Sequence, residues 1–171
     1  GLTKQGVEVN ILRPFGPRIL HGKMPQEFVD ELNNDCDSII ADEQKRKELD
    51  ESQELVGHVS EELKCDMTDP KFKRFGGYLC EMTKCLHNEY LKEKNVELDN
   101  PDQLAIHNSW FVRSFEYDYN PTHIHTGSSI SCVIYLKVPE NISTVNSRNT
   151  KEKYATEGYI DFIYGSSSAL T

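Results

Sequence analysis

The strongest constraint on the fold is a change in the spacing of apolar residues at Asn100-Pro101. Before this boundary, six apolar residues recur at three- and four-residue steps, which is typical of one face of a long amphipathic helix. After it, residues 104–115 alternate and are rich in β-branched and aromatic side chains, which indicates a strand. Helices followed by antiparallel strands predict an α+β fold in which helices support a sheet or barrel. The six helical positions are Phe72, Phe75, Leu79, Met82, Leu86 and Tyr90.

Shorter patterns predict the elements of the N-terminal part. Residues 7–13 alternate like a short strand and end in the turn cluster of residues 14–17, and a second apolar run covers 18–21. Pro25 is well placed in the first turn of a helix. The highly charged stretch 42–51 is expected to face solvent.

Four further segments complete the sequence-based assignment. Residues 56–63 are compatible with a loop or a short element. The apolar run 129–138, ended by proline, predicts a buried strand, and 159–164 predicts a further strand. The polar stretch 140–157 between them is expected to be a long loop.

The chain is expected to form a single domain over residues 1–171, because this length suits one ordinary core. Residues 1–100 form its mainly helical support with short N-terminal strands, and 101–171 form its β part. Three strands with exposed edges do not make a stable closed β domain. Either residues follow Thr171, or other copies or the N-terminal strands complete the sheet. The second possibility favours a homo-oligomer.

Composition argues against two classes of partner. The net charge of −9 disfavours nucleic acid, because phosphate binding requires clustered lysine and arginine. No apolar run approaches the roughly 18 residues that a membrane span needs. The five scattered cysteines are expected to be unreactive or core thiols of a reduced cytoplasmic protein.

The candidate chemistry lies at His123 and His125. Histidines at i and i+2 of an extended segment point to the same side, roughly 7 Å apart at the backbone. Their imidazole nitrogens can converge on one cation at about 2.1 Å, although surface or hydrogen-bonded histidines are the alternative. The context favours a metal, because the pair follows a turn at Asn120-Pro121 and precedes Gly127, where backbone can approach closely.

A second candidate site lies on the apolar run that follows. Tyr135 and Lys137 fall on one side of the predicted strand and form a polar pair that could receive the carboxylate of a small acid. An aromatic residue and a snorkelling lysine at a sheet edge are an equally good interpretation.

The stretch from Tyr119 to Pro139 closely resembles a group of 2-oxoglutarate- and iron(II)-dependent oxygenases. These enzymes are related to the prolyl-4-hydroxylase-like oxygenases and are frequent in marine bacteria and cyanobacterial viruses. Their pattern is a tryptophan strand, then His-x-His, then Ser-x-x-x-Tyr-Leu-x-x-Pro. The resemblance covers residues 55–165 and is specific over 108–139. The residues that carry it are Asn108, Ser109, Trp110, His123, His125, Ser131, Tyr135, Leu136 and Pro139.

The resemblance implies a double-stranded β-helix, or jelly roll, supported by the N-terminal helices. It implies Fe(II) held in a histidine-rich variant of the 2-His-1-carboxylate triad. His123 falls at the first histidine ligand, and His125 falls where other relatives place the carboxylate. Tyr135 lies on a strand that contributes a 2-oxoglutarate contact, and Arg113 lies on the strand behind it. The implied partners are 2-oxoglutarate, O2 and an unidentified substrate, in a bacterial or virus-infected cell.

The chain departs from the family pattern after residue 165. The family carries a distal histidine ligand and then an arginine for 2-oxoglutarate, but no histidine follows His125 and the last arginine is Arg148. His107 is expected to face away from the pair, because Trp110 is the expected core residue and lies on the opposite pleat. Two interpretations stay open: an oxygenase whose C-terminal part is missing from this chain, or a non-catalytic jelly-roll module, for example in a virus. A cupin-like metalloprotein is a third.

Overall fold

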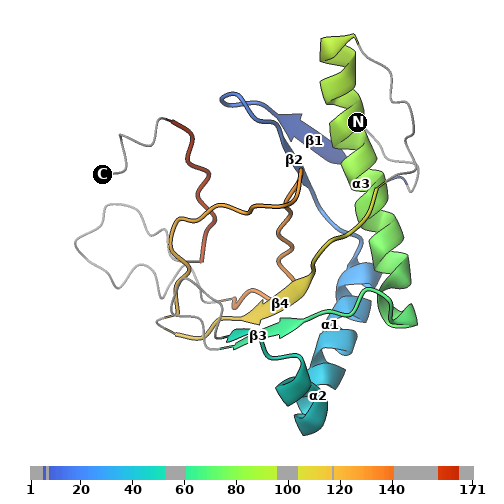
Figure 1. Cartoon of the computed structure of the whole chain (residues 1–171), viewed down its shortest axis with the longest axis vertical. Helices are drawn as coiled ribbons and strands as arrows, with labels where there is room; N and C mark the ends of the chain where they lie inside the picture. The colour runs from blue at the N-terminus through green and yellow to red at the C-terminus, as the bar shows by residue number, and fades with distance from the viewer. Residues whose placement is uncertain are drawn as a thin grey trace, which may run out of the picture.

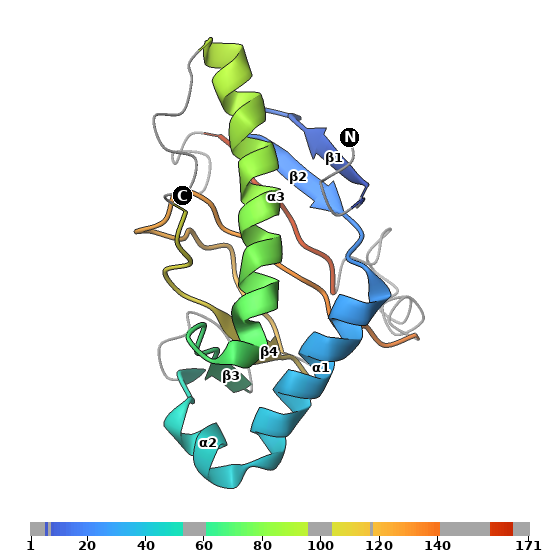
Figure 2. The same cartoon turned by 90° about the vertical axis from the view of Figure 1, so that its right-hand side faces the viewer.

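The protein combines helices with small antiparallel sheets in a computed structural model. The helices lie along one side, and the β-hairpin and the extended C-terminal segments lie on the other (Figure 1, Figure 2). This arrangement confirms the α+β prediction. The structure describes residues 6, 8–52, 61–95, 104–116, 118–140 and 158–165.

The first two strands form a hairpin, as the sequence predicts. β1 (Val9–Leu12) pairs antiparallel with β2 (Ile19–Gly22), with Val9 opposite Gly22. The turn cluster between them bends the chain back. At this turn, the ring of Phe15 stacks on Tyr164 with centroids 5.8 Å apart, which brings a C-terminal segment against the hairpin.

Two helices follow the hairpin. α1 (Gln26–Ala41) begins directly after Pro25, whose fixed φ suits the start of a helix. α2 (Glu43–Glu48) begins at Asp42, whose carboxylate accepts hydrogen bonds from two backbone N–H groups. α2 has no buried residue, which confirms that the charged stretch faces solvent.

The second sheet joins distant parts of the chain. β3 (Glu61–Lys64) pairs antiparallel with β4 (Trp110–Arg113). For residues 56–63 the sequence allows a loop or a short element. β3 covers the end of this stretch and favours the short element, and residues 53–60 lie outside the described part. β4 confirms the predicted strand, but it is shorter than the alternating pattern of 104–115.

The long helix predicted from the apolar stripe is α3 (Pro70–Lys94). Asp69 caps its start, and Asn95 ends it in the left-handed conformation. The stripe is buried at its beginning, where Phe72 is 2% exposed, whereas Tyr90 near its end is 46% exposed. No described helix is long and apolar enough to cross a membrane.

The main core lies where α1 and α3 meet the second sheet. It contains Leu63, which is fully buried, and Phe72. A smaller cluster of Val9, Phe28 and Tyr78 connects the hairpin to the two helices. The remaining members of the main core are Leu32, Ile39 and Cys65.

The predicted strands at 129–138 and 159–164 are wrong, because neither forms a ladder with another described strand. Neither segment has strand structure, and most of their side chains are exposed, with Val133 63% and Phe162 58% exposed, although Leu136 packs against the main core. An alternating pattern supplies one face to bury, yet strand structure also needs a hydrogen-bonded neighbour. The described residues form two two-stranded sheets and do not display the double-stranded β-helix. The predicted loop at 140–157 lies outside the described residues after 140.

Candidate metal centre

The histidine pair lies in the segment that follows β4. At the end of β4 the chain turns between Phe115 and Asp118, whose backbone N–H donates to the Phe115 carbonyl at 3.1 Å. The Asp118 carboxylate accepts the Phe115 N–H in return, at 2.9 Å. These two hydrogen bonds precede Pro121 and the two histidines along the chain.

Each of the two imidazoles turns its Nε2 atom toward the other ring. The Nε2 atoms of His123 and His125 are 3.2 Å apart, and the ring planes are nearly perpendicular. Two nitrogen ligands at about 2.1 Å from one cation are about 3.0 Å apart at a right angle and about 3.4 Å apart in a tetrahedron. The observed separation lies between these values and is compatible with two adjacent positions on one metal ion, and it is equally the length of a direct hydrogen bond between the two rings.

A backbone carbonyl fixes the orientation of the first ring. His123 Nδ1 lies 2.7 Å from the carbonyl oxygen of Pro121, so Nδ1 carries the proton and donates it. Nε2 of the neutral ring is then left with its lone pair, the form that binds a metal. A ligating histidine held by a hydrogen bond from its other nitrogen is typical of metal sites.

An indole holds the second ring. The Trp110 and His125 ring centroids are 5.7 Å apart at an interplanar angle of 41°. The sequence predicts Trp110 as a core residue, but the structure places it half-buried at the start of β4 and against the site. Its membership of the site was missed, because spacing along the sequence does not show that residue 125 folds back onto residue 110.

The described residues supply two ligands and no third. No group of three histidine, cysteine, aspartate or glutamate side chains that could hold a metal occurs in the described ranges. His107 belongs to no such group in these ranges. Both histidines are exposed, and Ile124 between them is 84% exposed, so this face is open to solvent.

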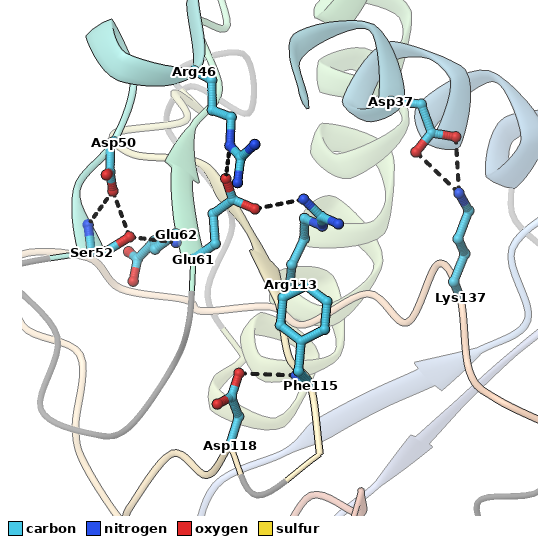
Figure 3. A network of polar contacts seen from close by, with 10 residues as sticks. All are labelled: Asp37, Arg46, Asp50, Ser52, Glu61, Glu62, Arg113, Phe115, Asp118 and Lys137. Carbon is cyan, nitrogen blue, oxygen red and sulfur yellow. Dashed lines mark hydrogen bonds and ion pairs between the residues drawn. The ribbon is translucent and has the colours of Figure 1, made fainter. Parts of the chain in front are cut away.

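Arg113 lies in an ion-pair network with Glu61 and Arg46 (Figure 3). Its Nη1 donates to Glu61 Oε2 at 2.7 Å, and Arg46 binds the other oxygen of the same carboxylate. The Glu61 side chain is only 8% exposed, so the two guanidinium groups compensate a nearly buried charge. The Arg113 guanidinium also lies 5.1 Å from the Phe115 ring centroid.

Tyr135 and Lys137 lie on the extended segment beside α1. Lys137 Nζ contacts both carboxylate oxygens of Asp37, at 2.9 and 3.1 Å (Figure 3). Asn33 holds the same segment by donating to the Leu136 carbonyl at 3.2 Å. Tyr135 is 52% exposed. Because Lys137 is paired with Asp37, a joint carboxylate site with Tyr135 would have to break this ion pair.

Two cysteines belong to the core, as the sequence predicts. Burial raises the pKa of Cys36 to about 12 and that of Cys65 to about 11, so both thiols stay protonated near neutral pH. They are therefore poor nucleophiles and poor metal ligands. Cys132 is exposed and lies outside this core.

A cavity of about 430 Å³ lies between α1 and α3, and no predicted site residue lines it. Its walls include Arg74, whose guanidinium lies 4.5 Å from the Phe28 ring centroid. The same guanidinium pairs with Glu27 and Glu31, at 3.2 and 3.1 Å. Since its charged groups already have partners, this cavity offers less chemistry than the histidine pair.

Comparison with known families points to the same segment. The family model described as "Putative 2OG-Fe(II) oxygenase" matches residues 108–162. The match includes β4, both histidines and the extended segments, and it leaves out the helices. No curated protein and no solved structure matches the chain. The match supports the oxygenase family, which implies Fe(II) and 2-oxoglutarate.

Proposed function

We propose that this chain carries the metal-binding segment of an Fe(II)- and 2-oxoglutarate-dependent oxygenase of the hydroxylase type. One observation carries the proposal: His123 and His125 present Nε2 atoms 3.2 Å apart, within the segment that matches the oxygenase family. This spacing suits two adjacent ligands of one cation. The substrate is a protein or a small molecule, with peptidyl hydroxylation related to prolyl 4-hydroxylation as the first candidate.

In this proposal the two imidazoles hold Fe(II), and the Pro121 carbonyl keeps His123 in the ligating tautomer. A jelly roll would bring a third protein ligand to the pair, since a 2-His-1-carboxylate site has three. When bound, Fe(II) would supply the oxidative decarboxylation of 2-oxoglutarate to succinate and CO2, with one oxygen atom of O2 entering succinate and the other entering a C–H bond of the substrate.

Tyr135 is the proposed 2-oxoglutarate contact on the segment after the pair. Its phenol is exposed and can donate a hydrogen bond to a carboxylate. Arg113 is the second proposed contact, but its guanidinium already binds Glu61. A 2-oxoglutarate carboxylate at Arg113 would therefore compete with Glu61, so Tyr135→Phe is expected to raise the KM for 2-oxoglutarate more than Arg113→Lys.

The decisive experiment is an anaerobic Fe(II) titration of the protein encoded by the complete gene, followed by measurement of succinate from 2-oxoglutarate after O2 is admitted. Wild-type protein is expected to bind one Fe(II) and form succinate, and His123→Ala and His125→Ala to lose both. His107→Ala is the matched control, because this exposed histidine does not join the pair. Folded protein that forms no succinate would instead support the non-catalytic jelly-roll module.

A further inference from the structure

The two histidines of the candidate site are held by different means. The His123 ring is fixed by its hydrogen bond to the Pro121 carbonyl, 2.7 Å away. In the described part of the chain, the His125 ring has contacts with His123 and with Trp110. Trp110 therefore contacts the His125 ring from outside the pair.

Trp110 is well suited to fix a neighbouring ring. It is the first residue of β4 and is paired with Lys64 of β3, so its backbone is anchored in the second sheet. Its ring lies 5.7 Å from the His125 ring, within the 4.5–7 Å range of attractive aromatic pairs. An exposed imidazole loses rotamer freedom when it binds a metal, and a stacked neighbour reduces this loss because the ring is already held.

We propose that Trp110 is a positioning residue for metal binding, which holds the His125 imidazole so that its Nε2 faces His123. This inference rests on the metal-binding part of the proposed function. Trp110 is also the only tryptophan of the chain, so its fluorescence reports directly on the site. A paramagnetic ion bound at the pair lies close to the indole and quenches its emission.

The test titrates Co(II) into the complete protein and its variants, and follows the cobalt absorption spectrum and the heat of binding. Neither readout depends on tryptophan. Trp110→Ala is expected to weaken Co(II) binding by about two- to tenfold, the size of one aromatic pair, and to change the cobalt spectrum. Trp110→Phe is expected to restore most of the affinity. Phe115→Ala, which removes an exposed aromatic side chain just after β4, is expected to bind as wild type does.

Tryptophan emission of the wild type is expected to be quenched by Co(II), and His125→Ala is expected to abolish the quenching. A metal-free readout tests the contact itself: Trp110→Ala is expected to shift the His125 ring-proton resonances, because the ring current of the indole is lost. Unchanged cobalt affinity in a folded Trp110→Ala protein would overturn the inference and leave the proposed function standing. A wild type that binds no Co(II) and no Fe(II) would overturn both.

Discussion

The helical region of residues 8–95 and the histidine-bearing region of residues 104–165 differ in how far their apolar side chains are buried. The first contains the buried apolar residues, from Val9 to Tyr78. The second contains β4 and extended segments in which many large apolar side chains face solvent, among them Tyr135 and Phe162. The helical region therefore supplies the core, and the candidate site lies on the region that adds little to it.

The difference follows from where helices and extended segments find partners for their backbone hydrogen bonds. A helix satisfies its backbone within one segment, so α1 and α3 need only a surface on which to bury one face. An extended segment needs a neighbouring strand for its N–H and C=O groups. β4 has this neighbour in β3, whereas residues 129–138 have none in the described part of the chain.

The largest expected effect is at Leu63, on β3. This side chain is fully buried, so Leu63→Ala removes apolar contacts and leaves a cavity. We expect a loss of about 2–5 kcal/mol in the free energy of unfolding, measured by urea denaturation.

Val133→Ala is the matched change in the other region, since Val133 is 63% exposed. It is expected to alter the free energy of unfolding by less than about 0.5 kcal/mol. Equal losses for the two variants would show that residues 129–138 pack as tightly as the helical core, and the contrast between the regions would fail.

The second prediction concerns Glu61, which joins the two regions through Arg113. Glu61→Gln leaves two guanidinium groups beside a neutral side chain, so we expect a loss of about 2 kcal/mol. This loss in the free energy of unfolding is smaller than the loss expected for a fully buried ion pair, because both arginine side chains are partly exposed. Glu43→Gln is the control, because the Glu43–Lys47 pair is exposed. A loss at Glu61 no greater than at Glu43 would exclude the network as a link.

The third prediction concerns pH and the thiol of Cys36, whose pKa is raised by burial to about 12. Between about pH 9 and 12 the unfolded chain loses this proton while the folded protein keeps it, so stability falls as pH rises. Cys36→Ala is expected to flatten this alkaline slope in urea denaturation. Leu32→Ala also reduces the buried core but removes no titratable group, so its slope should match that of the wild type. Equal slopes for all three proteins would show that the Cys36 thiol does not cause the alkaline loss of stability.

Much of the helical region is predictable from sequence, because its signals are local. Pro25 and Asp69 mark where α1 and α3 begin, and the charge of residues 42–51 indicates their exposure. The strands at 129–138 and 159–164 were wrong for a physical reason: alternation reports which face could be buried, and it does not report whether a pairing strand is present.

Only part of the candidate site is predictable from the sequence. The spacing of His123 and His125 predicts that both rings can reach one cation; the structure brings their Nε2 atoms to 3.2 Å, and metal binding itself stays a prediction. The roles of Pro121 and Trp110 were not predictable, because each depends on how the chain folds back beyond β4. Whether Arg113 binds 2-oxoglutarate stays a prediction, and its bond to Glu61 could not be read from sequence.

The smallest expected effect is at Lys137, whose ion pair with Asp37 ties the histidine-bearing region to α1. Both side chains are more than half exposed, so Lys137→Met should reduce the free energy of unfolding by less than about 0.5 kcal/mol. The loss should shrink further at high salt, because exposed charges are screened. A double-mutant cycle with Asp37→Asn measures the coupling. A coupling of about 2 kcal/mol would mean that the exposed region is fastened to the helices as firmly as β4 is to β3.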